Sequence, residues 1–289
     1  MLKSIRFVSS YNARNLKFQL TCPRLERASL TYFPLYGTNI QWDNLTHLTL
    51  YSISINDSFF ILRKTPRLVI CKVSGDGPRY TEPSIGPLVL TSLRSLQLIT
   101  DSTPDYLNNL IAPHLEEFSL PNYYNPSMEV ITSFLRRSAC SLRSFTVTFS
   151  TFPPYFEGFI SLVQSLPSLN TLLMISITDS DLEDTTPEDC DPRNILQIVT
   201  EILYSQSTSL FQRGFLPNLK ILEYTGQLCL RSGNYGDQYT LPPADNSAVL
   251  GPLHLLKLDL RPATRIPKNM ISYLSSLVER GVTASECFI

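Results

Sequence analysis

Three histidines, His47, His114 and His254, are the residues in this sequence best suited to act as a general base or a metal ligand near neutral pH. No cysteine or carboxylate stands near them at a metal-ligand spacing. The sequence also contains no H-E-x-x-H, G-x-S-x-G, P-loop or G-x-G-x-x-G motif. We therefore predict a protein that is not an enzyme, with no catalytic residue, no metal and no cofactor. A hydrolase that uses His47 or His114 with partners from other parts of the chain is the less favoured alternative.

The six cysteines are widely scattered and form no C-x-x-C pair. This spacing indicates reduced thiols that serve as small apolar side chains. They are Cys22, Cys71, Cys140, Cys190, Cys229 and Cys287.

An acidic stretch, residues 179–191, has seven acidic residues among thirteen and could be mistaken for a calcium-binding loop. Asp179 and the two acidic residues at alternate positions after it match the first ligands of an EF-hand. The sixth position, which needs glycine, is Asp184, and the twelfth, which needs glutamate, is Cys190. We interpret the stretch as an exposed loop.

Charge and hydropathy argue against two kinds of partner. The 289 residues include 24 basic and 25 acidic side chains, a net charge of −1, which gives no electrostatic reason to bind nucleic acid or an anionic membrane. No apolar run approaches the roughly 18 residues of a membrane span, and the N-terminus does not resemble a signal peptide. The sequence thus predicts an intracellular protein, cytoplasmic or nuclear.

A short phrase recurs along the chain: leucine, two residues, an apolar residue, one residue, and a second apolar residue. One clear copy is Leu45-Thr46-His47-Leu48-Thr49-Leu50. Seven of the nine intervals between successive copies lie within the period of roughly 20–29 residues that is typical of leucine-rich repeats. The first leucines of the ten copies, which we name anchors, are Leu2, Leu25, Leu45, Leu68, Leu93, Leu115, Leu142, Leu169, Leu219 and Leu255.

The phrase predicts a short strand after each anchor, with Leu48 and Leu50 facing inward and His47, Thr49 and Tyr51 facing outward. Stacked repeats would bury their leucines in one continuous core. A proline often lies two residues before the anchor, where we expect it to end the preceding element and favour an extended start to the strand. These prolines are Pro23, Pro66, Pro113, Pro167 and Pro217.

Helical spacing recurs between the strands, at residues 57–64, 126–137, 156–166, 195–204 and 268–280. The prediction is an α/β leucine-rich-repeat solenoid, with a curved parallel sheet on the concave side and helices and loops on the convex side. We expect residues 1–289 to form one domain of about ten repeats, with loop insertions near 179–191 and 229–246. A doubly wound α/β domain is the alternative.

Outward strand positions should align in columns across such a sheet. One predicted column runs from Arg6 to Glu223 and Asp259, and its neighbour runs from Ser4 to Ile221 and Lys257. We predict that these columns bind a protein partner on the concave face. The candidate partner-binding residues are Arg27, His47, Tyr51, Lys72, Gln97, Glu117, Thr146 and Glu223.

The cadence of Trp42-Asp43-Asn44-Leu45-Thr46-His47-Leu48-Thr49-Leu50, and of Leu166-Pro167-Ser168-Leu169-Asn170-Thr171-Leu172, resembles the leucine-rich-repeat region of F-box proteins abundant in mushroom-forming fungi. In that family an N-terminal F-box binds the Skp adaptor of a ubiquitin ligase, and the repeats hold the substrate. Here the first phrase begins at Leu2, which leaves no room for an F-box.

The resemblance therefore implies the recognition half of the receptor, and a Skp-type adaptor only if an F-box lies upstream. The alternative is a structural scaffold or a truncated gene product without a ligase role.

Overall fold

The computed structural model describes most of the N-terminal two thirds of the chain and shorter segments beyond it. The described residues are 2–9, 18–20, 22–33, 38–77, 86–121, 127–149, 156–176, 218–226, 253–260, 275, 278–279 and 283–285. They belong to two compact units, which we describe separately. The first comprises Met1–Asn122 and Pro126–Leu142, and the second comprises Tyr123–Asn125 and Arg143–Ile289.

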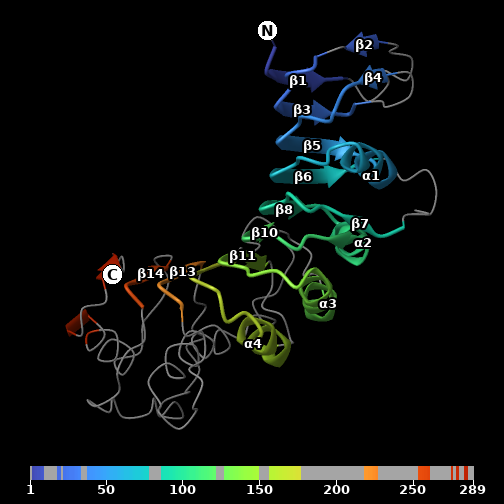
Figure 1. The fold of residues 1–289 in the computed structure, drawn as a ribbon. Helices are drawn as coiled ribbons and strands as arrows, with labels where there is room; N and C mark the ends of the chain where they lie inside the picture. The colour runs from blue at the N-terminus through green and yellow to red at the C-terminus, as the bar shows by residue number, and fades with distance from the viewer. Residues whose placement is uncertain are drawn as a thin grey trace, which may run out of the picture. The chain divides into compact units, whose positions relative to one another are not determined.

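The first unit is built around a parallel sheet whose strands follow the order of the sequence (Figure 1). Each strand begins two residues after a predicted anchor, which confirms the strand positions in this unit. The alternation of buried and more exposed residues along the strands is also confirmed. In order, the strands are β1 (Ser4–Val8), β3 (Arg27–Thr31), β5 (His47–Ile53), β6 (Ile70–Asp76), β8 (Ser95–Ile99) and β10 (Glu117–Pro121).

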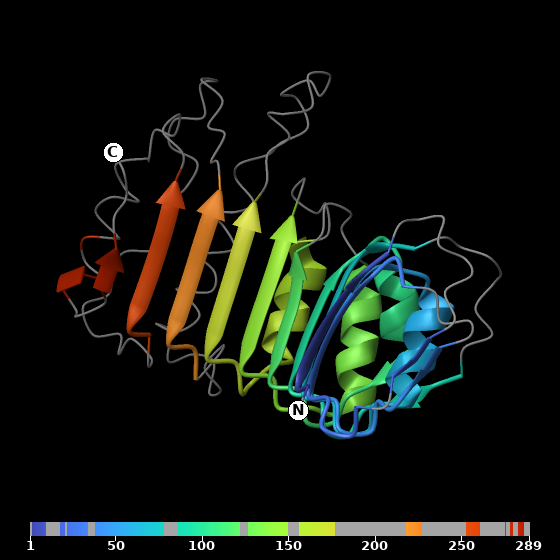
Figure 2. The ribbon, with the colours of Figure 1, turned by 90° about the horizontal axis from the view of Figure 1, so that it is seen from above.

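Three helices of the first unit lie together on one side of this sheet (Figures 1 and 2). They are α1 (Ile55–Arg63), α2 (Thr103–Asn109) and α3 (Met128–Ser138). The sequence predicted α1 and α3 to within two residues at each end, and Ser54 caps α1. The Ser54 hydroxyl accepts the Asp57 backbone N–H at 3.2 Å and donates to the Asp57 carboxylate at 2.8 Å.

Helix α2 and two small parallel sheets were not predicted. The first small sheet pairs β2 (Phe18–Leu20) with β4 (Thr38–Ile40), and the second pairs β7 (Leu88–Val89) with β9 (Leu110–Ile111). Strands of two or three residues carry too little alternation to stand out in a sequence.

A β-turn before β3, β5, β6, β8, β10 and β12 explains the prolines. The anchor backbone N–H donates to the carbonyl three residues earlier, for example Leu25 to Cys22 at 3.0 Å and Leu68 to Thr65 at 3.1 Å. Proline two residues before the anchor is therefore the second residue of the turn, where its fixed φ is favourable. Our expectation of an extended lead into the strand was wrong at Pro23, Pro66, Pro113 and Pro167, because the hydrogen bonds show a turn.

The core of the first unit is a stack of equivalent side chains from successive repeats. The anchors Leu25, Leu45, Leu68, Leu93 and Leu115 are at most 1% exposed. Helix side chains complete the stack: Phe59 of α1 lies against Tyr106 of α2 with ring centroids 5.5 Å apart. Burial of these side chains from the second to the sixth repeat holds strands and helices together, as expected where one repeat alone cannot form a core. In the first repeat the predicted anchor Leu2 is 46% exposed, which corrects the expectation that it is buried.

The second unit holds a parallel sheet of β11 (Ser144–Phe149), β12 (Thr171–Ser176), β13 (Ile221–Gly226), β14 (Leu255–Leu260) and β15 (Thr283–Ser285). Helix α4 (Phe156–Gln164) precedes β12 and agrees with the predicted helix at 156–166. The chain as described is thus an α/β protein with extensive parallel sheet and few helices.

The register of β14 contradicts one prediction. Ile221 lies beside Leu255 and Glu223 beside Lys257, so the anchor of this repeat is Leu253, which is 5% exposed, and not Leu255. Both leucines begin a matching phrase, Leu253-His254-Leu255-Leu256-Lys257-Leu258 and Leu255-Leu256-Lys257-Leu258-Asp259-Leu260. A shift of two residues preserves the inward and outward pattern of a strand, so the pattern could not choose between them.

The predicted helix at 195–204 and the predicted loops at 179–191 and 229–246 lie outside the described residues. Only scattered positions of the predicted helix at 268–280 are described, and they are helical. Within the described part of the chain, no helix is both long and apolar enough to cross a lipid bilayer.

Candidate partner-binding face

The outward side chains of the first sheet form columns, because neighbouring strands are parallel and in register. We name this surface the strand face; it comprises the outward residues of β1, β3, β5, β6, β8 and β10. One column consists of Ser4, Arg27, His47, Ile70, Ser95 and Glu117. The next consists of Arg6, Ser29, Thr49, Lys72, Gln97 and Ser119.

The structure places the predicted residues of this unit on these columns or just beyond them. Arg27 and His47 are lateral neighbours, as are Lys72 and Gln97. Tyr51 lies between Thr31 and Ser74 in a third column. Arg27 and Glu117 are exposed, and the others are half-buried. The predicted set in the first unit is thus one laterally continuous surface.

The other two predicted residues belong to the second unit. Thr146 of β11 lies beside Leu173 of β12, and Leu173 lies beside Glu223 of β13. The next residue in this column is Lys257 and not Asp259 as predicted, because of the two-residue register of β14. Glu223 is therefore flanked by a basic residue, and this end of the column is less acidic than the sequence indicated.

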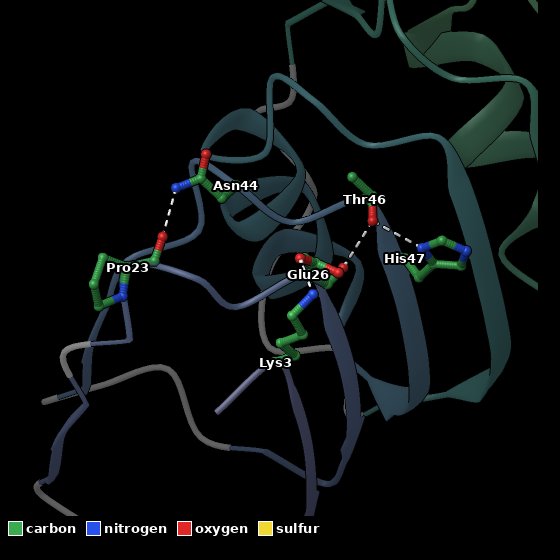
Figure 3. A network of polar contacts seen from close by, with 6 residues as sticks. All are labelled: Lys3, Pro23, Glu26, Asn44, Thr46 and His47. Atoms are coloured by element: carbon green, nitrogen blue, oxygen red, sulfur yellow. Dashed lines mark hydrogen bonds and ion pairs between the residues drawn. The ribbon is translucent and has the colours of Figure 1, made fainter. Parts of the chain in front are cut away.

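His47 is held by a polar network at the beginning of β5 (Figure 3). The Thr46 hydroxyl donates to the Glu26 carbonyl at 3.0 Å, so its oxygen accepts the His47 Nδ1–H at 2.8 Å. Desolvation by burial and the charge of Arg27 together lower the pKa of His47, against the opposing effect of Glu26. The ring is oriented by a hydroxyl and not by the carboxylate that a general base of the hydrolase type would use.

His114 serves in a series of side-chain bonds between repeats. Its Nδ1 donates to the Thr91 carbonyl, which can only accept, at 2.7 Å. At the equivalent position of other repeats, Asn44 donates to the Pro23 carbonyl at 2.7 Å (Figure 3) and Ser92 to the Pro66 carbonyl at 3.0 Å. Asn218 of the second unit donates to Pro167 in the same way, at 2.9 Å. In these four repeats, the residue before the anchor thus ties one repeat to the previous one.

His254 does not share this position, although the sequence placed it there. With Leu253 as the anchor, His254 follows the anchor, and its backbone N–H donates to the Lys220 carbonyl at 2.8 Å. In the described part of the chain, no hydrogen bond joins a histidine side chain to a carboxylate, and the Thr46 hydroxyl that contacts His47 donates its proton to the Glu26 carbonyl and not to the ring. Among the same residues, no group of three or more His, Cys, Asp and Glu residues is placed to hold a metal ion. The acidic stretch 179–191 lies outside that part.

The described cysteines Cys22, Cys71 and Cys140 are free thiols, but only Cys71 is buried as the predicted small apolar side chain, and the other two are half-buried. Cys71 is a member of the core, and desolvation raises its pKa to about 12. A thiol held protonated in this way is unreactive and serves as a small apolar side chain.

Asp76, at the end of β6, is an organising residue that the sequence analysis missed. Its carboxylate accepts the Thr100 hydroxyl and the backbone N–H groups of Asp101 at 2.9 Å and Ser102 at 3.2 Å, just before α2. Asp105 after Pro104 is the local signal that could have indicated a helix start here. Asp76 lies about one repeat earlier in the sequence than its partners, so no pattern of neighbouring residues indicates this contact.

Comparison with known proteins adds no assignment. No protein-family model, no curated protein and no solved structure matches this chain.

Proposed function

We propose that this chain is a leucine-rich-repeat solenoid that recognises another protein through its outward strand positions and catalyses no reaction. In this respect it would resemble the substrate-binding part of an F-box receptor. A role in ubiquitin ligation, with a Skp-type adaptor as partner, belongs to the proposal only if an F-box lies upstream.

The observation that carries the proposal is the lateral register of the strand face. Residues from six repeats, 20 to 25 positions apart in the sequence, align side by side in the columns described above. Strands in a sheet are about 4.8 Å apart, so each column displays a side chain at about that interval. Such an array suits an extended partner that contacts several repeats at once.

Two further features support recognition by this surface. The bonds from Asn44, Ser92 and His114 fix successive repeats at the amino-terminal edge of the strands, which leaves the face itself preorganised. Ser, Thr, Gln and charged side chains on the columns offer hydrogen bonds to a partner, while Ile70, which is 40% exposed, offers an apolar contact.

Site-specific photo-crosslinking tests the proposal. A benzophenone amino acid is placed at Gln97 on the strand face and, in a matched control, at Arg136 on α3, which is exposed on the helix side. Each purified protein is irradiated in an extract of the source organism, with and without an excess of unlabelled wild-type chain. We expect one protein of the extract to crosslink to the benzophenone at position 97, and we expect the excess of unlabelled wild-type chain to abolish this crosslink. Equal crosslinking of that protein from position 136 would contradict the proposal.

A further inference from the structure

The strand face of the first unit has an uneven charge distribution. In the two columns defined above, the residues on β1, β3, β5, β6 and β8 include three permanent cations, Arg6, Arg27 and Lys72, and no carboxylate. Asp76, exposed at the end of β6, is bonded to the residues just before α2. The first carboxylate in these columns is Glu117 on β10. The chain as a whole has a net charge of −1, so this local excess of positive charge is not a consequence of composition.

These cations differ from the basic residues at the amino-terminal edge of the same strands. At the edge, Lys3 pairs with Glu26 at 3.2 Å and Arg94 pairs with Glu116. Among the residues the structure describes, Arg6, Arg27 and Lys72 form no ion pair. The edge charges are thus neutralised within the protein, while the charges on the face remain available to a partner.

The spacing of the three cations restricts the partner. With strands about 4.8 Å apart and a rise of about 3.3 Å per residue, Arg6 lies roughly 8 Å from Arg27, Arg27 roughly 12 Å from Lys72, and Arg6 roughly 14 Å from Lys72. An extended peptide advances about 3.3 Å per residue, so it would meet these charges with residues about two to four positions apart.

Apolar surface accompanies the cations. Ile70 lies between His47 and Ser95 in one column and is 40% exposed, and Val8 at the end of β1 is 64% exposed. Exposed apolar side chains beside unpaired cations suit a peptide that alternates acidic and apolar residues. Three cations would neutralise too few phosphates for firm binding of nucleic acid to a chain without a net positive charge.

We propose that the strand face over β1, β3, β5, β6 and β8 binds an extended peptide segment whose Asp or Glu residues recur every two to four positions. The inference rests on the proposed function and names the class of partner. The carboxylates would contact Arg6, Arg27 and Lys72, and an apolar residue between them would contact Ile70.

A display experiment with a random library of twelve-residue peptides tests this. Peptides selected on the full chain are sequenced, and the most enriched one is synthesised with a fluorescent label. Its affinity is measured by fluorescence polarisation at low and high salt. The variants are R27E/K72E on the face and R24E/R136E as a control with the same charge change, since Arg24 and Arg136 are exposed and lie off the strand face. R27Q/K72Q provides a second, milder face variant.

We expect selected peptides rich in Asp and Glu at this spacing, with binding at least tenfold weaker to R27E/K72E, weaker in high salt, and within twofold of wild type for R24E/R136E. Selected peptides without an acidic excess would overturn the inference. If these still crosslink to a benzophenone at position 97, the proposed function stands and only the partner class fails. Crosslinking from the helix side alone would overturn both. A twelve-nucleotide RNA that binds more tightly than the selected peptide would also overturn the inference.

Discussion

The carboxylate of Asp76 accepts the backbone N–H of Ser102 at 3.2 Å, so the end of one strand holds the residues that lead into the helix of the next repeat. Helix α2 is only seven residues long, from Thr103 to Asn109, and its preceding residue Ser102 makes no side-chain capping bond. A helix this short is marginal in water by itself. Asp76, from a neighbouring repeat, orders the two residues that precede this helix, Asp101 and Ser102.

Replacement of Asp76 by alanine should lower the free energy of unfolding by about 1 kcal/mol, in the range expected for the loss of intramolecular hydrogen bonds. Urea unfolding followed by circular dichroism measures the change. The matched control is D101A. Asp101 donates its backbone N–H to Asp76, and this bond survives replacement of the exposed Asp101 side chain by alanine. Equal destabilisation by D76A and D101A would show that the hydrogen bonds to the Asp76 carboxylate do not stabilise this part of the fold.

Acid should weaken the same contact. Burial of Asp76 by itself would raise the pKa of this carboxyl, but the hydrogen bonds from Thr100, Ser102 and Asp101 outweigh it and hold the pKa below its ordinary value. A carboxyl with a lowered pKa in the folded state contributes stability above its unfolded pKa, near 4, and loses it as the pH falls through the folded pKa.

The difference in unfolding free energy between wild type and D76N should therefore be present at pH 6 and should shrink below pH 4. Urea titrations across this range measure it. A difference that stays constant down to pH 2 would be inconsistent with an ionised Asp76 as the acceptor.

The corrected register of β14 gives a direct comparison of two leucines. Leu253 is 5% exposed in the core, while Leu255 is an outward, half-buried residue. L253A should cost about 2–5 kcal/mol of stability, as large-to-small core replacements do, and L255A should cost less than about 1 kcal/mol. Chemical unfolding of the two variants decides between the registers, because the register predicted from the sequence requires the opposite order.

Cysteine accessibility should follow burial. Cys71 is 1% exposed with its pKa raised to about 12, whereas Cys22 is half-buried in the turn before β3. Iodoacetamide at pH 8 should modify Cys22 in the native protein and Cys71 only after unfolding in guanidinium. Peptide mass spectrometry over time gives both rates. Equal rates in the native protein would mean that the core around Cys71 is open.

The parts of the fold that could be predicted are those encoded in each repeat. The anchor leucine and the alternating residues after it located the strands and the outward columns. Successive side chains of a strand point to opposite faces, so alternation of apolar and polar residues identifies both faces. The helical spacing of apolar residues between the strands located α1, α3 and α4. The contribution of proline was misjudged, since Pro23 and Pro66 lie within turns whose closing hydrogen bonds the sequence does not show.

The parts that could not be predicted depend on contacts between repeats. Helix α2 depends on Asp76 from the previous repeat, and the bond from His114 to Thr91 depends on the stacking of two turns. For β14, two phrases fitted equally well, and the bonds of His254 and Leu255 to the Lys220 carbonyl decide the register. The candidate face was predicted as a set of residues, and the structure adds which of them are neighbours.

Charge reversal on the outward columns is the decisive test of partner binding by these residues. The variant K72E/E117K/E223K alters three such positions, and D43K/R136E/E279K alters three exposed positions elsewhere with the same total change in charge. The protein crosslinked from position 97 is purified, and its affinity for both variants is measured by isothermal titration calorimetry. We expect at least tenfold weaker binding to the first variant and unchanged binding to the second, with both variants folded by circular dichroism. Unchanged binding to K72E/E117K/E223K would contradict partner binding by these residues.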